Sequence, residues 1–327
     1  MDALIKPHRP TVPHDTTIVL STSGGKDSTA TMLLLMEWEI PFIPVFADTG
    51  NEHEATLEYL YSLPDKIGCP PIITVKADFT NRIAAKRKFI ANDKRDPNLP
   101  GRLGGWSDEA KEKALEVLYP SGNPFLDLCL WKGRFPSRKA QFCSEELKAN
   151  TAYEEVIEPI LISGKQVWSV RGIRKDESLA RANTQQFETD TRYAEEITQF
   201  HPIADWTAAE VFKMHKRHGL EPNPLYRLGM GRVGCMPCIN ASKQELYEIS
   251  VRFPEHIEKV KEWERIVSLA CKRQESTFFA AKTTPFKKVA HIADVVSWSK
   301  TAHGGRKFDL LKTLEPPACS SIYGLCE

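Results

Sequence analysis

The stretch that decides the fold is TTIVLSTSGGKDSTATMLLLMEWEI, residues 16–40. Its first part, TTIVLS, is rich in β-branched and apolar residues and predicts a short strand. From Asp27 the apolar residues recur with helical spacing until Pro41, so we expect a helix over 27–40. The loop between them holds two glycines, a lysine and several hydroxyl residues, and glycine lets backbone N–H groups approach an anion. The stretch therefore predicts a phosphate-binding turn between a strand and a helix.

The following segments continue the same alternation. Two further strands are expected over 42–50 and 71–78, with a helix over 52–68 between them. This order is typical of an α/β fold with a doubly wound parallel sheet. Ligands of such sheets lie beyond the carboxyl ends of the strands, where the SGGKDS loop and the DTG turn (48–50) both fall.

The rest of the chain gives a coarser pattern. We expect a strand, a turn and a helix start within 164–183, and an amphipathic helix over 204–220. Charged helical segments follow over 242–274, with a break near Pro254. Residues 80–140 show less regular periodicity.

Composition excludes some classes of protein. The chain has 327 residues, 41% hydrophobic and 27% charged, which are ordinary values for a soluble globular protein. A net charge of +1 does not by itself indicate a nucleic-acid partner. No apolar run is long enough for a membrane span or a signal peptide, so we expect no membrane partner and a cytoplasmic location. In that reducing compartment, eight cysteines indicate metal ligands, buried thiols or reactive thiols rather than disulfides.

Although the net charge is close to zero, basic residues are concentrated in two segments of the chain. Residues 82–105 hold seven Lys and Arg against two Asp, and WKGRFPSRK (131–139) is also basic. Such a run is often only a solvated surface. Because it flanks the expected site, it is also consistent with a basic face for an anionic substrate such as a nucleic acid.

The SGGKDS loop differs from the common phosphate-binding signatures. A P-loop needs glycine where this chain has Leu20, and the G-x-G-x-x-G pattern is absent. Lys26 and the hydroxyls of Ser23 and Ser28 can surround a pyrophosphate. A helix start capped by Asp27 or Ser28 would explain those residues, but not the two glycines and the lysine together.

STSGGKDST (21–29) resembles the PP-loop of the ATP pyrophosphatase superfamily, whose fold is adenine nucleotide alpha-hydrolase-like. Members typically cleave ATP to AMP and pyrophosphate and thereby activate an oxygen for substitution. VFADTGNEHEATLEYL (45–60), VRGIRKDESLAR (170–181) and the block from His201 to Cys238 resemble the phosphoadenosine phosphosulfate (PAPS) reductase-like branch. The resemblance covers residues 16–240 in order.

The resemblance implies a set of nucleotide contacts. The phosphates would be held by Ser21, Ser23, Gly24, Gly25, Lys26, Asp27 and Ser28, with Lys26 and Asp27 catalytic. Asp48, Thr49 and Gly50 would lie beside the adenosine. Arg171, Gly172, Arg174 and Arg181 belong to the segment that would contact phosphate or sulfate, since a guanidinium fork suits an oxyanion. The alternative for these arginines is surface ion pairing with Asp176 or Glu177.

The cysteines form a second pattern. Cys235 and Cys238 make a C-x2-C pair, which zinc, an iron–sulfur cluster or a redox dithiol can use, and Cys143 lies 92 residues before it. In related adenosine phosphosulfate (APS) reductases, a tandem Cys pair and a C-x2-C at similar spacing bind a [4Fe–4S] cluster. Phe142 stands in place of one tandem cysteine, so the fourth ligand would come from Cys129, Cys319 or Cys326. We favour Cys326, and zinc less than the cluster.

The family includes more than one chemistry. Sulfonucleotide reductases release sulfite with a C-terminal thiolate, and YGLCE (323–327) loosely resembles their tail, whereas DNA phosphorothioation enzymes keep an intact SGGKDS loop. We therefore expect an ATP-dependent, Mg²⁺-assisted sulfur-transfer enzyme acting on DNA or tRNA, with Cys319 in a catalytic role and a sulfur donor such as a cysteine desulfurase. A sulfonucleotide reductase with a thioredoxin partner and an iron–sulfur nucleotide-binding regulator remain alternatives.

These patterns suggest two domains. Residues 1–240 would form the PP-loop nucleotide-binding domain with the iron–sulfur site. Residues 241–327 would form a mainly helical region that carries the cysteine-bearing tail.

Overall fold

The structure is a computed structural model that describes residues 7–190, 197–279, 290–301, 321–323 and 325. The predictions for Cys319 and Cys326 lie outside the described residues.

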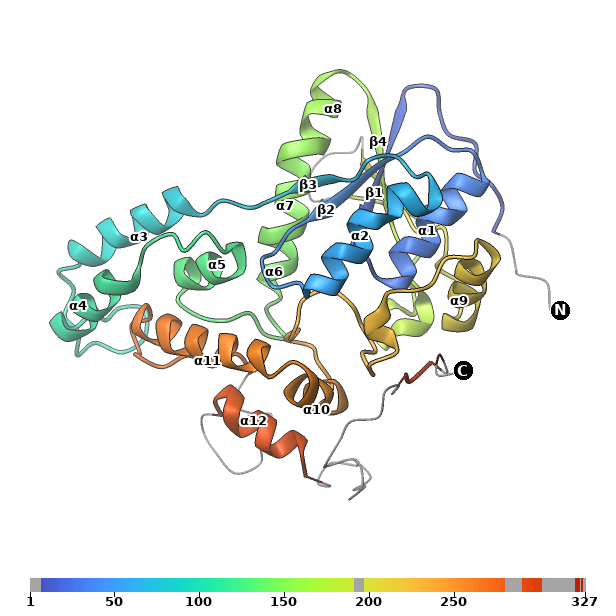
Figure 1. The fold of residues 1–327 in the computed structure, drawn as a ribbon. Coiled ribbons are helices and arrows are strands. Elements are labelled where there is room, and N and C mark those ends of the chain that lie inside the picture. The colour runs from blue at the N-terminus through green and yellow to red at the C-terminus, as the bar shows by residue number, and fades with distance from the viewer. Residues whose placement is uncertain (1–6, 191–196, 280–289, 302–320, 324, 326–327) are drawn as a thin grey trace.

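A six-stranded sheet forms the centre of the molecule (Figure 1). Its strands are β1 (Thr16–Thr22), β2 (Ile43–Ala47), β3 (Ile73–Val75), β4 (Gln166–Arg171), β5 (Phe187–Thr189) and β6 (Ile197–Phe200). They lie in the order β3-β2-β1-β4-β6-β5, and all neighbours are parallel except the β5–β6 pair. The register places Ser21 of β1 opposite Arg171 of β4, at the carboxyl ends of both strands. The predicted α/β fold with a doubly wound, mostly parallel sheet is confirmed.

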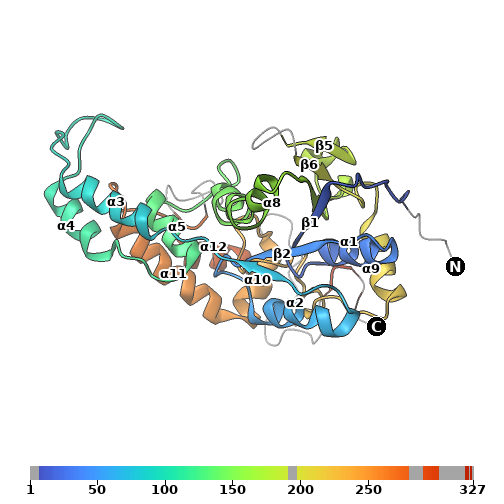
Figure 2. The same cartoon turned by 90° about the horizontal axis from the view of Figure 1, so that it is seen from above.

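Helices cover both faces of the sheet (Figures 1 and 2). One face carries α1 (Lys26–Glu37), α2 (Glu54–Ile67) and α9 (Ala208–Arg217). The other carries α6 (Phe142–Ser144), α7 (Asn150–Ala152) and α8 (Glu158–Ile162), which π-helical turns at Glu145–Ala149 and Tyr153–Ile157 join into one rod. Strand alternation produces the two cores, because Ile18 and Leu20 pack on the first face and Val19 on the second.

A helical lobe lies beside the sheet. It contains α3 (Thr80–Ala91), α4 (Asp108–Val117), α5 (Pro124–Lys132), α10 (Lys243–Arg252), α11 (Pro254–Leu269) and α12 (Ile292–Ser299). The sequence indicated little regularity in 80–140, but three helices form there. Phe125 of α5 stacks on Trp263 of α11, with ring centroids 5.4 Å apart, so segments from both sides of residue 240 share one core. The domain division at residue 240 stays a prediction.

Local signals set several helix boundaries. Thr207 and Glu210 form a capping box at the start of α9, and Pro254 separates α10 from α11 as expected. The segment after β4 forms only short 3₁₀ turns at Lys175–Glu177 and Leu179–Arg181, and a third lies at Pro224–Tyr226. Among the described residues, no helix has both the length and the apolar character needed to cross a membrane.

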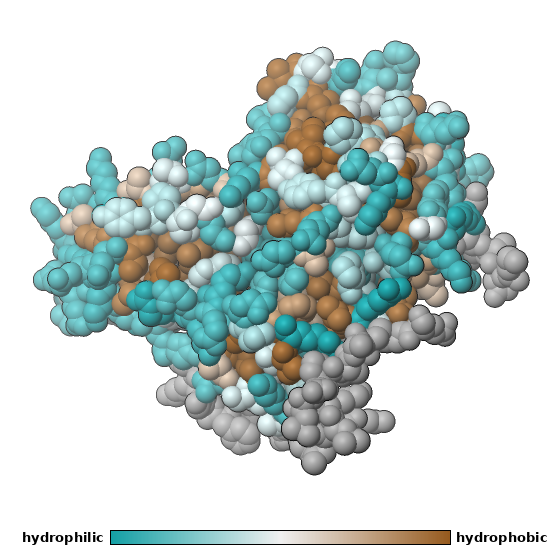
Figure 3. Space-filling view, in the orientation of Figure 1, coloured by the Kyte–Doolittle hydropathy of each residue, from teal (hydrophilic) through white to brown (hydrophobic). Residues whose placement is uncertain are grey.

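Part of the basic segment serves the fold itself. Lys86 donates to the carbonyls of Leu130 and Ala270, and burial lowers the pKa of its ammonium to about 8. Arg87 donates to two carbonyls of the α4 end, and Arg95 pairs with Asp93. These three residues therefore have a structural role, which neither the solvated-surface nor the basic-face interpretation of the segment includes. Mainly hydrophilic side chains cover the α3–α4 end of the molecule, at the left of Figure 3.

Candidate active site

A cavity of about 360 Å³ opens at the carboxyl ends of β1 and β4, a volume in the range of small-ligand sites. The predicted residues that line it are Ser21, Ser23, Gly25, Lys26, Asp27, Ser28, Arg171, Gly172 and Arg181. The fold therefore brings the loop and the segment after β4 together at one site, although they are about 150 residues apart in the sequence.

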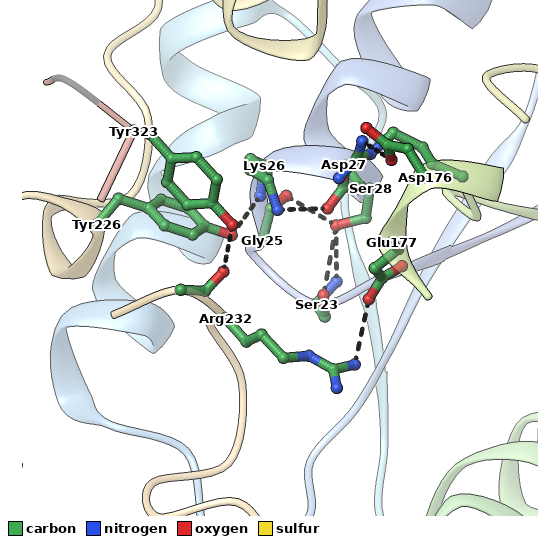
Figure 4. A network of polar contacts seen from close by, with 12 residues as sticks. Ser23, Gly25, Lys26, Asp27, Ser28, Asp176, Glu177, Tyr226, Arg232 and Tyr323 are labelled. Atoms are coloured by element: carbon green, nitrogen blue, oxygen red, sulfur yellow. Dashed lines mark hydrogen bonds and ion pairs between the residues drawn. The ribbon is translucent and has the colours of Figure 1, made fainter. Parts of the chain in front are cut away.

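The loop is fixed by its own polar groups and by Tyr226 (Figure 4). Gly25 is the N-cap residue of α1 and no side chain caps this helix, so neither Asp27 nor Ser28 has that role. Ser28 Oγ donates to the carbonyl of Gly25 and accepts from the N–H of Ser23. The N–H of Lys26 donates to the Tyr226 hydroxyl at 2.9 Å. The turn thus has a defined shape in the protein alone.

Lys26 lies in an aromatic and acidic setting. Its side chain is 4% exposed, and Nζ lies 2.9 Å from Asp27 Oδ2. Nζ also lies over the rings of Tyr226 and Tyr323, at 5.4 and 5.0 Å from their centroids. The Tyr323 hydroxyl donates to the carbonyl of Gly231, and Tyr323 is three residues before Cys326 in the sequence. The described part of the tail therefore contacts the loop.

Arg174 supports the loop from behind the cavity. Its side chain is 4% exposed, its Nε lies 2.5 Å from Asp27 Oδ1, and its fork also binds Asp176. Arg174 is not among the lining residues, whereas Arg181, which pairs with Glu177, is. The ion pairs Arg174–Asp176 and Arg181–Glu177, which the sequence offered as the alternative, therefore both form. The second pair lines the cavity and the first lies directly behind it, so neither is on a distant surface. Arg232 also reaches Glu177, at 3.3 Å.

Gly172 allows β4 to approach the loop. A Cβ built on Gly172 would lie 2.6 Å from the carbonyl carbon and oxygen of Asp27, which no real side chain permits. This close approach gives a local physical reason for glycine after Arg171.

The DTG turn hydrogen-bonds Glu52, and it is Glu52 that lines the cavity. Asp48 accepts the N–H of Gly50, whose carbonyl accepts from Asn123, and Thr49 Oγ1 donates to Glu52 Oε1 at 2.7 Å. Gly24, Asp48, Thr49 and Gly50 are not among the described lining residues, whereas Glu52 is. Their contact with a nucleotide stays a prediction.

The thiols gather beside this cavity. A second cavity of about 120 Å³ is lined by Cys235 and Cys238 and shares Lys148, Arg232 and Val233 with the first. Burial raises the pKa of the Cys235 thiol to about 12 and also raises that of Cys143. The Lys148 ammonium opposes both effects, and the negative charge that Cys235 carries as a thiolate raises the pKa of Lys148 in return.

The donor set fits a metal group. Thiols with raised pKa values become thiolates when a positive metal centre lies beside them. Zn–S bonds of 2.3 Å would bring the sulfurs of a zinc site to about 3.8 Å from one another. Among the described residues, the Sγ atoms of Cys143, Cys235 and Cys238 do not all lie within 4.8 Å of one another, and the kind of metal group that they would hold stays a prediction. Cys129 is buried close to Cys143, and no disulfide joins the described cysteines.

The site residues that were not predicted include Glu52, Lys148, Tyr226 and Arg232. Glu52 and Tyr226 stand inside the motifs DTGNEHE and NPLY, so attention to each polar residue of those motifs would have found them. Lys148 follows Cys143 by five residues on the helical rod, and only the turn geometry there reveals which way it faces.

Comparison with known proteins agrees with this geometry. The family model described as "Phosphoadenosine phosphosulfate reductase domain" matches residues 17–241. The chain belongs to the phosphoadenosine phosphosulfate reductase family. The match contains the whole SGGKDS loop, the segment VRGIRKDESLAR (170–181) and the C-x2-C pair.

Individual members of this family are similar to different extents. The "Uncharacterized 37.8 kDa protein in gpa 5'region" of Escherichia phage 186 is 46% identical over 324 residues, which covers 94% of this chain and 96% of that protein. The adenosine 5'-phosphosulfate reductase of Burkholderia cepacia is 33% identical over 100 residues, 30% of this chain and 39% of that enzyme. The crystal structure of the PAPS reductase of Candida auris, a phosphate complex, matches with a TM-score of 0.42 at 15% identity and covers 70% of this chain and 84% of that one.

Proposed function

We propose that this member of the family is an ATP-dependent sulfur-transfer enzyme that forms AMP and pyrophosphate. The supporting observation is the intact loop, in which Lys26, Asp27 and Ser28 line a cavity that adjoins the thiols through Lys148. A site that only bound a nucleotide would not need a buried lysine beside the expected position of the leaving phosphates.

The chain's own residues have separate tasks in this reaction. An acceptor oxygen attacks the α-phosphorus, the α–β bond breaks, and Lys26 with the loop amides stabilises the charge on the leaving pyrophosphate. Arg171 and Arg181 orient the phosphates or the acceptor, and Arg174 keeps Asp27 in place. A sulfur nucleophile from the donor then displaces AMP from the activated centre.

Two absent groups would complete the site. Cys143, Cys235 and Cys238 would hold a [4Fe–4S] cluster, with the fourth ligand unassigned, and Asp27 is a carboxylate suited to Mg²⁺. When bound, Mg²⁺ neutralises phosphate charge and the cluster supplies redox-active iron beside the cavity.

The acceptor that we favour is the backbone phosphate of DNA, as in phosphorothioate modification, with tRNA as the second candidate. Arg82, Lys88, Lys94 and Arg102 remain exposed in the basic segment, and a phosphate backbone would be attracted by them.

A sulfonucleotide reductase is the second candidate, because a specific contact favours it. Tyr323 lies over Lys26, which brings the described tail, three residues before Cys326, to the cavity. A reductase needs a C-terminal thiolate there, and relatives with partial matches are named adenosine 5'-phosphosulfate reductases.

One product assay separates the two functions. Anaerobically purified protein is given Mg–ATP or PAPS in separate reactions, each with reductant, a sulfur donor and duplex DNA, and the products are resolved by chromatography. AMP and pyrophosphate from ATP, with PAPS unchanged, would support sulfur transfer. Adenosine bisphosphate and sulfite from PAPS, with ATP unchanged, would replace the proposal by the reductase. Turnover of neither nucleotide would favour the binding regulator.

Lysine variants provide the control. Lys26→Met should reduce ATP cleavage by about 100-fold or more, the usual effect of removing one donor to a developing charge. Lys165→Met is the matched variant, because Lys165 is exposed just before β4, at the opposite end of the sheet.

A further inference from the structure

A second cluster of metal-binding side chains lies outside the cavity described above. His53 is the N-cap residue of α2, Glu54 is its first helical residue, and His256 is in the first turn of α11. One ligand atom from each of the three lies within 4.8 Å of the others, and this is the one such His, Cys, Asp or Glu group found among the described residues. None of the three lines either cavity.

The distances suit a single ion. Glu54 Oε2 lies 3.8 Å from His53 Nδ1 and 3.8 Å from His256 Nε2, and the two imidazole rings stack with centroids 5.1 Å apart. Tetrahedral zinc with bonds near 2.1 Å would place these atoms about 3.4 Å apart. A small rotation of the exposed Glu54 side chain closes that difference.

Hydrogen bonds fix which nitrogens are available. The Nδ1 of His256 lies 3.2 Å from the carbonyl of Met236, and a carbonyl only accepts, so this nitrogen carries the proton. Its Nε2 therefore has a lone pair directed towards Glu54, the arrangement in which a second-shell carbonyl orients a metal ligand. The Nδ1 of His53 accepts the N–H of Ala55, so a metal would compete with this helix cap for the same lone pair.

Charge and access also fit a cation. Burial lowers the pKa of both histidines. Glu54 is 77% exposed in its side chain, which gives an ion a route from solvent. Glu255 and Glu58 add negative potential at His53, while Lys259 opposes it from the next turn of α11.

We propose that His53, Glu54 and His256 form a binding site for a divalent transition metal of the Zn²⁺ class, with a water molecule completing the coordination. Two imidazoles and one carboxylate are donors that this class prefers. The ion joins the start of α2, three residues after the DTG turn, to α11, and the bond from His256 to Met236 links it to the backbone between Cys235 and Cys238. The role of the ion is structural: it holds the backbone between Cys235 and Cys238 against α2. This role does not depend on the reaction proposed above.

The test measures metal binding rather than activity. Full-length protein is dialysed against Zn²⁺, and the zinc content per chain is determined for the protein with His256 and for His256→Gln. Both proteins also carry Cys235→Ser and Cys238→Ser, so that zinc on these thiols does not enter the comparison, and the protein with His256 should hold one more equivalent. Equal zinc content in the two proteins would overturn the proposal.

A gentler pair of variants covers the case in which His256→Gln fails to fold. Glu54→Gln and Glu58→Gln change two exposed carboxylates one turn apart on α2, and only Glu54 is a proposed ligand. Loss of a partner that merely orients a ligand weakens binding about 10- to 100-fold, so loss of Glu54 itself should weaken zinc binding at least 10-fold. Glu58→Gln removes negative potential but no ligand, so it should weaken zinc binding much less than Glu54→Gln. The same zinc affinity in both variants would show that the histidines only cap and stack.

Discussion

The backbone N–H of Lys26 donates a hydrogen bond to the Tyr226 hydroxyl, 2.9 Å away, across 200 residues of sequence. Tyr226 is 1% exposed and comes from the NPLY segment, while Lys26 begins α1 in the SGGKDS loop. The shape of the loop therefore depends on a block that lies far along the chain and close to the C-x2-C pair.

Removal of the Tyr226 hydroxyl should loosen the loop. Tyr226→Phe leaves the buried N–H of Lys26 without an acceptor, which costs about 1–3 kcal/mol of unfolding free energy. Urea denaturation measures this loss, and nucleotide affinity should fall with it. Tyr61→Phe is the matched variant, since Tyr61 is 49% exposed and its hydroxyl hydrogen-bonds the side chain of Thr74 on the surface. Equal stability of the two variants would mean that the hydroxyl does not support the loop.

The Arg174–Asp27 pair gives a second prediction. Both side chains are largely buried, and Arg174→Met leaves Asp27 with Lys26 as its remaining cationic partner, so the loss should be about 1.5–3 kcal/mol, the usual contribution of a hydrogen bond to a charged group. The neighbouring Lys175 pairs with Asp205 at the surface, with side chains 40% and 76% exposed, so Lys175→Met should cost at most about 1 kcal/mol. Urea midpoints of the two variants check the contrast. A small loss in both would show that Arg174 does not hold Asp27.

Periodicity predicted the sheet well, because β1 to β3 and their helices are short, buried and clearly separated. It failed for α3, where Ile83 and Ile90 are the buried residues among many charged ones, so the apolar stripe is too sparse to recognise. The lobe that α3 joins is built from contacts such as Phe125 on Trp263, which no local pattern contains.

The residues of the candidate site also fall into two groups, those that the sequence could predict and those that it could not. The loop residues could be predicted because their chemistry is local, and nine predicted residues line the cavity. Arg174 could not be distinguished from Arg181 by sequence, since only the fold decides which guanidinium turns inward. Lys148 carries no motif of its own, and its position between thiols and cavity arises from the packing of the helical rod against the sheet.

The thiol site predicts a selective loss of iron. Cys235→Ser removes a ligand of the proposed cluster, so anaerobically purified protein should lose its brown colour and nearly all of its iron. Cys69→Ser is the control, because Cys69 is a buried thiol packed in the core of the α1 and α2 face. Colorimetric iron analysis of both variants provides the measurement. Full iron content in Cys235→Ser would exclude this residue as a ligand.

The last prediction concerns pH and His215. His215 is 1% exposed, its Nε2 donates to the carbonyl of Lys26 at 3.0 Å, and its Nδ1 has no hydrogen-bond partner among the described residues. Burial lowers the pKa of this ring, so a proton on Nδ1 would be buried without an acceptor. Between the folded pKa and about 6.5, the unfolded chain binds more protons than the folded one, and stability therefore rises with pH.

The contribution of His215 is accordingly complete above pH 6.5 and is lost as pH falls through the folded pKa, with a slope of at most about 1.4 kcal/mol per pH unit. His215→Gln keeps a donor for Lys26 but does not titrate, so its unfolding free energy should fall less steeply between pH 7 and 5. His14→Gln serves as the control because the His14 side chain is fully exposed. Urea titrations at half-unit pH steps measure the three profiles. Parallel profiles for the wild type and His215→Gln would mean that the buried ring takes up no proton on unfolding in this range, and that its contact with the SGGKDS loop is not an acid-sensitive part of the fold.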